Sequence, residues 1–197
     1  MVTHGAFALD ADLQIRGGAS MMTRPDDHTR TDEPLEVSEA LSATLRGVIA
    51  SYLSAQRRLA ADDLAGAREA AGALAEALAE PPPPEPAEAL EAWRSIAEEA
   101  RAHAARLAAA ETIQDARGAF EPLSAQLARA LRVFGNPTEH ALALAFCPMA
   151  FDDRGAEWIQ EQGAVDNAYF GAAMRTCGTL RATVPPGEHL LGAEVRR

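Results

Sequence analysis

The sequence predicts a mainly α-helical protein, an antiparallel four-helix bundle with a small irregular, short-strand cap near the C-terminus. Apolar residues recur at steps of three and four over residues 35–134, which is the period of helices with one buried face. Proline, glycine and acidic breaks divide this stretch into four segments with short connections, which favour antiparallel neighbours. After residue 140 the helical period is lost, which separates the cap from the bundle.

Residues 1–24 have a different pattern from the rest of the chain. Apolar and polar side chains are interleaved between Ala6 and Ile15, which predicts a short strand and a turn into a short helix. Residues 25–34 are polar and begin and end on proline, so we expect a linker there. The bundle and its cap are expected over residues 35–184, and residues 185–197 are expected to form a frayed tail.

The first two helices are separated by acidic residues. Pro34 stands where an early helical position tolerates proline, so the first helix is expected directly after it. Asp62 and Asp63 mark a break and the acidic start of the second helix. The apolar face of the first helix comprises Leu41, Leu45, Val48, Tyr52 and Leu53, and that of the second comprises Leu64, Ala67, Ala71, Leu74 and Leu78.

The third and fourth helices follow a proline-rich spacer at residues 81–86, which stops the second helix. Thr112 and Asp115 have the spacing of a capping box at the start of the fourth helix. Pro122 is expected to kink this helix, and Gly135 to end it. The apolar face of the third helix comprises Leu90, Trp93, Ile96, Ala100, His103 and Leu107, and that of the fourth comprises Ile113, Ala116, Phe120, Leu123, Leu127, Leu131 and Phe134.

The cap is expected to consist of short elements. Residues 141–146 are an apolar run that fits either a short strand or a short helix. A turn at residues 152–155, a short helix near Trp158 and a turn at residues 167–171 are expected to follow. Residues 180–184 fit a short strand.

Composition excludes several classes of function. The chain of 197 residues carries 29 acidic against 18 basic side chains, a formal net charge of −11, and such a chain repels phosphate backbones and anionic membranes. No apolar run is long enough to span a membrane, and no secretory signal is visible. Phosphate-binding glycine motifs and the motifs of serine hydrolases and zinc proteases are missing, so we expect no enzymatic activity and no nucleic-acid partner.

The residues with distinctive chemistry gather between positions 147 and 177. This stretch holds both cysteines, Cys147 and Cys177, and two of the five methionines, Met149 and Met174. A spacing of two residues in an extended segment, or of three in a helix or turn, places side chains on one side. If the two segments converge, their soft sulfur atoms would select Cu(I) or Ag(I). Two other interpretations stay open, a disulfide between the cysteines and sulfur side chains as ordinary core filling.

Histidine and aromatic residues complete the candidate site. His103 is a candidate imidazole ligand, although a histidine on an apolar helix face also fits a core residue. His140 lies seven residues before Cys147 and could approach the site along a strand. Asn167 is expected to bond nearby backbone in its turn. The rings expected to shield the sulfurs are Trp158, Tyr169 and Phe170, and the histidines expected to face solvent are His4, His28 and His189.

Four motifs in order connect the cap with a known family. They are Phe146-Cys147-Pro148-Met149-Ala150-Phe151, Gly155-Ala156-Glu157-Trp158, Asn167-Ala168-Tyr169-Phe170-Gly171 and Met174-Arg175-Thr176-Cys177-Gly178, and upstream Arg117, Phe120 and Leu123-Ser124 fit the same pattern. Over about residues 38–183 the chain resembles a helical domain of unknown function. That domain occurs alone and at the C-terminus of copper/silver (CusB-type) periplasmic adaptor, or membrane fusion, proteins of RND efflux pumps. The family pattern has proline in place of Ala168, so this chain loses a rigid turn but no candidate ligand.

The resemblance implies a periplasmic metal-binding domain. Residues 2–12 resemble the last part of the adaptor body, so residues 1–24 are interpreted as its remnant and the chain as N-terminally truncated. The implied function is capture of Cu(I) or Ag(I), or its delivery to an RND-type pump, with the pump and an outer-membrane channel as partners. The implied ligands, which match the family motif, are Cys147, Met149, Met174 and Cys177. The alternative is a structural or docking module of the adaptor in which a Cys147–Cys177 disulfide acts as a staple.

Overall fold

The structure, a computed structural model, describes residues 33–190. Every described element belongs to one compact unit of the chain. The strand and short helix predicted within residues 1–24 lie outside the described residues, as do residues 191–197.

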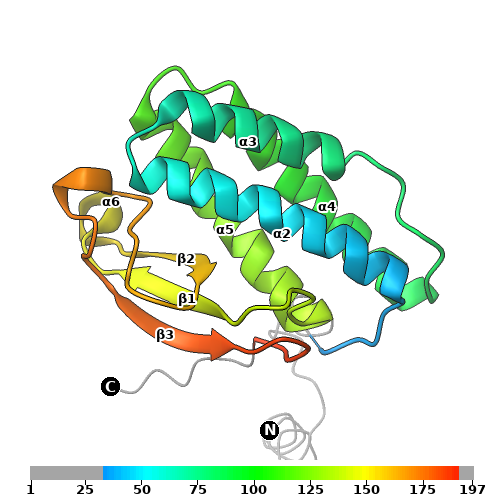
Figure 1. The fold of residues 1–197 in the computed structure, drawn as a ribbon. Helices are drawn as coiled ribbons and strands as arrows, with labels where there is room; N and C mark the ends of the chain where they lie inside the picture. Colours follow the sequence, from blue (N-terminus) through cyan, green and yellow to red (C-terminus); the bar gives the residue numbers. More distant parts are fainter. Residues whose placement is uncertain (1–32, 191–197) are drawn as a thin grey trace, which may run out of the picture. The chain divides into compact units, whose positions relative to one another are not determined.

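Four long helices form the predicted bundle. They are α2 (Glu39–Ala60), α3 (Leu64–Ala77), α4 (Ala87–Ala108) and α5 (Ile113–Phe134). Each helix packs mainly against the next in the sequence, and α2 also touches α5 (Figure 1). α5 runs as one helix through Pro122. The predicted apolar faces supply most of the core, with Tyr52 and Phe120 among its largest fully buried side chains.

Local hydrogen bonds set where the helices begin. α2 starts after Ser38 rather than directly after Pro34, because the Ser38 hydroxyl accepts a hydrogen bond from the Leu41 N–H at 3.2 Å. α5 starts with the predicted capping box. The Thr112 hydroxyl accepts from the Asp115 N–H at 3.1 Å, and the Asp115 carboxylate accepts from the Thr112 N–H at 3.2 Å.

Three short strands form the cap. They are β1 (Leu142–Cys147), β2 (Ala156–Glu161) and β3 (Thr179–Val184), in an antiparallel sheet of order β2-β1-β3. The apolar run at residues 141–146, which fitted either a strand or a helix, is therefore a strand. The helix predicted near Trp158 is wrong, since Trp158 lies in β2 opposite Ala145 of β1. The segment is too short for its own pattern to decide, and pairing with β1 makes it a strand.

One face of the sheet packs on the bundle. β2 lies against α5 and α2 (Figure 1). Leu144 of β1 is opposite Ile159 of β2, and the Ile159 N–H donates a hydrogen bond to the Tyr52 hydroxyl of α2. Because side chains alternate across a strand, Leu144 and Phe146 share one face, and Cys147 belongs to the other face.

The first part of the predicted tail is packed rather than frayed. The Leu190 N–H donates to the Leu131 carbonyl at 3.0 Å, and the Leu190 side chain is buried. His189, expected to face solvent, is half-buried, with Nδ1 3.0 Å from the Arg132 carbonyl oxygen. A pair of leucines shortly after two prolines carries too little pattern to predict this contact.

Tyr52 joins the bundle to the cap. Its hydroxyl shares a 2.8 Å hydrogen bond with Ser124 Oγ of α5 and accepts the Ile159 N–H at 3.1 Å. Its ring stacks on Phe120 with centroids 5.1 Å apart. Burial raises the pKa of Tyr52, so the hydroxyl stays neutral and available as a donor.

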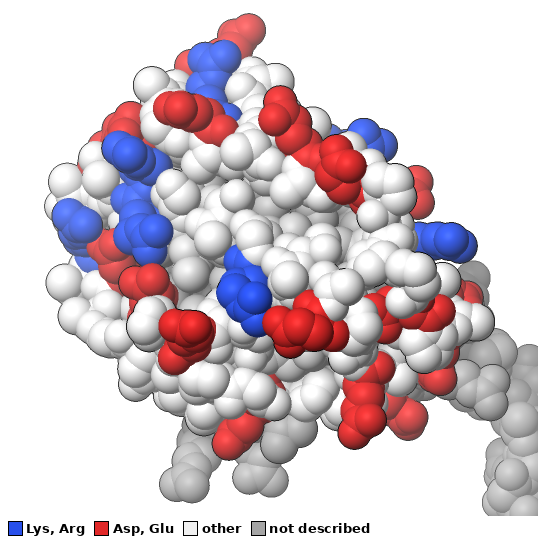
Figure 2. All heavy atoms as spheres, turned by 45° about the vertical axis from the view of Figure 1, so that its right-hand side comes forward, with Lys and Arg blue, Asp and Glu red and all other residues white. Residues whose placement is uncertain are grey.

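The surface is acidic but mixed in charge. Figure 2 shows one face, on which acidic side chains are spread with arginines among them. The acidic residues of the helices that could dock a basic partner are all exposed, namely Glu69, Glu76, Glu80, Glu98 and Glu99. Among the described residues, no helix combines the length and apolar character needed to cross a membrane.

Replacing Tyr52 with phenylalanine keeps the stacked ring and removes the hydroxyl. We expect Y52F to lower the free energy of unfolding by about 1–3 kcal/mol, because Ser124 and the Ile159 N–H lose a buried partner. Urea unfolding followed by circular dichroism measures the change. T44A is the control, since the Thr44 hydroxyl bonds only within α2, and it is expected to stay within about 0.5 kcal/mol. Equal stability of Y52F and wild type would contradict this role of Tyr52.

Candidate functional site

Three of the four predicted sulfur ligands lie together at one end of the sheet. The Sγ atoms of Cys147 and Cys177 are 3.7 Å apart, and Cys177 Sγ lies 4.0 Å from Met149 Sδ. Both thiols are free, with Cys147 buried at the end of β1 and Cys177 half-buried just before β3. Met149 is 46% exposed. The site therefore has a closed side at Cys147 and an open side at Met149.

The pairing of β1 with β3 brings the two cysteines together. Phe146 lies opposite Thr179 in this antiparallel pair. The residues that follow Phe146 therefore run beside the residues that precede Thr179. Cys147 and Cys177 occupy these adjoining positions, and Met149 lies in the turn that leaves β1.

A left-handed turn connects the site to β2. Phe151, Asp152 and Asp153 of α6 (Ala150–Asp153) have φ of 54°, 56° and 61°. Left-handed backbone costs roughly 1–2 kcal/mol for each residue that is not glycine, so neighbouring contacts must hold it. One such contact is the Phe151 ring, which meets the Tyr169 ring edge-on with centroids 5.3 Å apart.

Two glycines let the backbone approach closely beside the cysteines. Gly178 has φ of 133°, and a Cβ atom there would lie 2.7 Å from the Phe146 carbonyl oxygen and 3.3 Å from the Trp158 ring. Gly155 has φ of 77°, and a Cβ atom there would lie 2.6 Å from the Phe146 ring. A larger residue at Gly178 would force the strands apart, whereas one at Gly155 would displace the Phe146 ring.

Aromatic rings pack behind the buried thiol. Trp158 and Tyr169 belong to the same apolar cluster as Cys147, and their rings meet edge to face with centroids 5.6 Å apart. The Tyr169 hydroxyl donates to the Glu157 carbonyl at 2.6 Å, and burial raises the pKa of Tyr169 well above its usual value. Phe170 packs against the same cluster. Trp158 is opposite Ala145, two residues before Cys147, so its ring lies on the same face of the sheet as the buried thiol.

Asn167 has a larger role than the sequence predicts. It does form the predicted turn, because its Oδ1 accepts the N–H groups of Tyr169 at 2.8 Å and Phe170 at 3.2 Å. It is also fully buried, and its Nδ2 donates to the Cys177 carbonyl at 2.7 Å. The turn residues signal the first role, and nothing in the local sequence signals the second.

Arg117 of α5 anchors the same loop on the bundle. Its Nε donates to the Ala168 carbonyl at 2.9 Å, and its Nη2 pairs with Asp62 at 2.6 Å. Asp62 also accepts the Ala172 N–H at 2.9 Å. The bond from Ala172, followed by that from Arg117, holds the pKa of Asp62 below its usual value. Arg117 is part of the motif pattern, but its partners are visible only in the structure.

Contact with Cys147 affects the ionisation of Cys177. The pKa of Cys177 is raised, mainly by its hydrogen bond with Cys147 and then by burial. A thiol with a raised pKa is protonated at neutral pH, so a metal ion that binds it must displace a proton. Arg175 in the same loop already pairs with Asp166 at 2.6 Å, so its charge is compensated.

Met174 and His103 are not joined to the three sulfurs. Within residues 33–190, the Met174 sulfur makes no contact like those that link Cys147, Cys177 and Met149. His103 lies on α4 and lines a cavity of about 530 Å³ between α4 and α5. Burial, and then the charge of a neighbouring arginine, lowers the pKa of His103. In the part of the chain that the structure describes, no three His, Cys, Asp or Glu side chains gather as a metal site.

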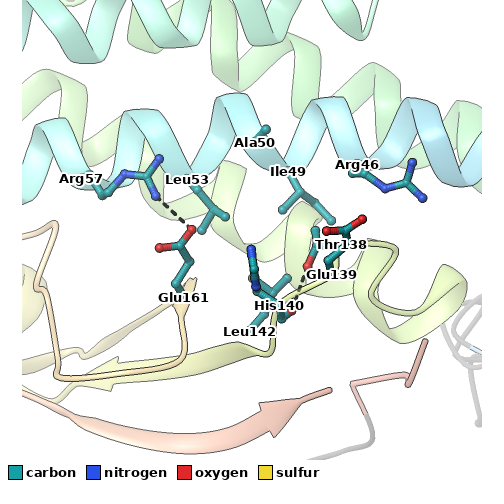
Figure 3. A pocket seen from close by; sticks show the side chains of 10 residues that line it. All are labelled: Arg46, Ile49, Ala50, Leu53, Arg57, Thr138, Glu139, His140, Leu142 and Glu161. Atoms are coloured by element: carbon teal, nitrogen blue, oxygen red, sulfur yellow. Dashed lines mark hydrogen bonds and ion pairs between the residues drawn. The ribbon is translucent and has the colours of Figure 1, made fainter. Parts of the chain in front are cut away.

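A separate cleft lies at the other end of β1. Figure 3 shows this cleft of about 280 Å³ between α2 and the start of β1, with His140 between them. Its other lining residues include Arg46, Ile49, Leu53, Arg57, Leu142 and Glu161. His140 precedes Cys147 by seven residues, which is about 20 Å along an extended chain. His140 therefore does not reach the sulfur site.

Comparison with known proteins identifies one domain. Residues 48–139 match the model of a family described as a protein of unknown function, DUF3347. The match covers most of α2 and all of α3 to α5, and it ends before β1, so all four predicted sulfur ligands lie outside it. No curated protein and no solved structure matches the chain.

The close approach at Gly178 predicts opposite effects for two glycine substitutions. We expect G178A to lower the free energy of unfolding by more than about 1 kcal/mol, because its φ is unfavourable for alanine and its Cβ meets Phe146. Gly72 lies inside α3 with open space around it, so G72A is expected to raise stability by about 0.5–1 kcal/mol. Urea unfolding of both variants tests this difference in sign. A stable G178A variant would show that the approach of β3 to β1 tolerates a side chain.

Proposed function

We propose that Cys147, Met149 and Cys177 bind one Cu(I) or Ag(I) ion, which the protein carries as cargo. The observation behind this proposal is the convergence of two thiols and a thioether, with separations of 3.7 Å and 4.0 Å. Two thiolates on one ion, at the metal–sulfur bond length of about 2.3 Å known for zinc, lie roughly 3.8–4.0 Å apart. The two cysteines therefore need almost no movement to share an ion.

The chemistry of the donors supports a soft monovalent ion. Thiolates and thioethers favour Cu(I), and by the same argument Ag(I). A structural zinc site takes four ligands from cysteine, histidine and carboxylate side chains. Among residues 33–190 no such cluster of three is found, so the sulfur set favours the soft ions.

The unequal exposure of the sulfurs supports transfer of the ion. The Met149 thioether is neutral at every pH and 46% exposed, so it can exchange with an incoming ligand without a proton transfer. Cys147 is buried behind aromatic rings and would retain the ion until last. Such an arrangement suits a protein that captures an ion and passes it on.

The cellular role in this proposal comes from the motif resemblance. The domain would work in the periplasm as part of a heavy-metal efflux adaptor. There it would capture the ion or deliver it to an RND-type pump that acts with an outer-membrane channel. The ligand set expected from the sequence also includes Met174 and His103. The titration below tests whether either residue binds the ion.

The same geometry favours a second candidate function, a structural or docking module. A disulfide bond is about 2.05 Å long, so the cysteine sulfurs would have to approach by less than about 2 Å. Oxidation would remove a proton and an electron from each thiol, and a disulfide-donating oxidant would take them up. The bond would tie the end of β1 to the start of β3, and the thiolates would no longer be available to an ion.

Competition for Cu(I) with a chromogenic chelator, under anaerobic conditions with reductant, tests the metal site. We expect one equivalent to bind tightly to the wild type. C147S and C177S should lose more than the roughly 10–100-fold in affinity that is typical when a residue only supports a ligand. M149L should bind more weakly than wild type, because it keeps the side-chain size and loses the thioether.

M174L and H103A are the matched controls, since neither side chain joins the three sulfurs. Both are expected to keep the wild-type affinity. Unchanged affinity in C147S and C177S would overturn the metal assignment. A loss in M174L or H103A would extend the ligand set beyond the three sulfurs.

Intact-mass measurement with and without a thiol reductant tests the staple. If the staple exists, the unreduced wild type is two hydrogens lighter, the reductant restores them, and C177S shows no shift. Because both cysteines are free in the structure, we expect the two preparations of wild type to have the same mass. A reversible loss of two hydrogens would favour the second candidate.

A further inference from the structure

We propose that Asn167 is the positioning residue that holds Cys177 at the distance from Cys147 that a shared ion needs. This inference rests on the proposed metal function. The two cysteines are placed by different means. Cys147 belongs to β1, the central strand, whereas Cys177 lies in the long connection between β2 and β3. The separation of the sulfurs therefore depends on what orders that connection as well as on the pairing of β3 with β1.

The Asn167 amide closes this connection into a ring. Its Nδ2 donates to the Cys177 carbonyl at 2.7 Å, and its backbone N–H donates to the Arg175 carbonyl at 2.7 Å. Cys177 itself is half-buried, so packing alone holds it less firmly than Cys147. One side-chain bond thus ties the second thiol to the start of the loop.

The start of the loop is in turn fixed to the framework. Asn167 Oδ1 accepts the Tyr169 N–H at 2.8 Å, and the Tyr169 hydroxyl bonds to the Glu157 carbonyl of β2 at 2.6 Å. The Arg117 guanidinium holds the carbonyl of the residue after Asn167 at 2.9 Å. Cys177 is therefore tied to β2 and α5 through Asn167.

The amide serves both partners of this bridge, and an ionised carboxylate of the same size cannot. Asparagine offers a donor and an acceptor, whereas an ionised carboxylate only accepts. N167D keeps the acceptor that forms the turn and loses the donor to Cys177. Asn167 is fully buried, so water cannot readily replace the lost donor. Residues that orient metal ligands typically change affinity 10–100-fold when altered, and we expect a loss of that size in N167D.

Asn136 provides a matched control at the opposite end of β1. It is 1% exposed, its Nδ2 donates to the carbonyls of His140 at 2.9 Å and Val184 at 2.8 Å, and its Oδ1 accepts from Thr138. N136D therefore removes a buried donor away from the sulfurs, and it breaks two hydrogen bonds where N167D breaks one. We expect it to cost at least as much stability in urea unfolding and to keep the wild-type affinity for Cu(I).

A measurement without metal separates this proposal from the metal function. In a glutathione buffer, glutathione disulfide accepts two electrons and two protons from the two thiols, which yields one protein disulfide and two glutathione thiols. The equilibrium constant reports how well the protein holds the two sulfurs together. We expect this equilibrium constant for disulfide formation to fall about tenfold or more in N167D and to stay at the wild-type value in N136D. N167S, which is neutral and keeps a short acceptor for the turn, should show the same fall and serves if N167D does not fold.

Two results would overturn the positioning role. One is a wild-type equilibrium constant in the folded Asn167 variants, and the other is an equal fall in N136D, which would mark a general effect of lost stability. If the wild type binds no Cu(I) while the Asn167 variants alone lower the glutathione equilibrium, the metal function fails and the positioning of the thiol pair stands.

Discussion

The register between β1 and β3 is the constraint on which the sulfur site depends. With Phe146 opposite Thr179, the buried thiol of Cys147 meets Cys177. A slip of one residue would turn Cys147 toward the helices, because side chains alternate across a strand. Gly178 sits against the Phe146 carbonyl at a distance that leaves no room for a side chain. The register of the sheet therefore determines which sulfur atoms meet.

The bundle and the cap are one folded unit, although the family match covers only the bundle. Tyr52 and Arg117, both within residues 48–139, supply polar contacts that reach across to β2 and to the loop before Cys177. Each contact satisfies a backbone group that folding buries, and losing it would leave that group unpaired. The helices therefore act on the sulfur site through hydrogen bonds to the backbone of the cap.

Long periodic segments could be predicted from the sequence better than short ones. The helices extend over 14 to 22 residues with regular apolar faces, and the Thr112 capping box is a local signal that the structure confirms. The six residues around Trp158 carry no such period, and their state depends on pairing with a distant strand.

At the site, residue chemistry identified three sulfurs that do meet. Met174 was selected by its spacing from Cys177 and by the motif, and His103 by its residue type; among the described residues neither joins the three sulfurs, which only the tertiary structure shows. The bond from Asn167 to Cys177 spans ten positions and leaves no local signal.

The exposed side of the sulfur site has a kinetic consequence. An ion held by these sulfurs would enter and leave on the side of Met149 and the half-buried Cys177, away from the buried Cys147. The residence time of the ion would depend on how often the Met149 thioether dissociates from it. Most affinity differences between related complexes come from such dissociation rates. An acceptor would have to present its own ligand on that side to receive the ion. The shape of the acceptor, as much as its affinity, would then decide which molecule receives the ion.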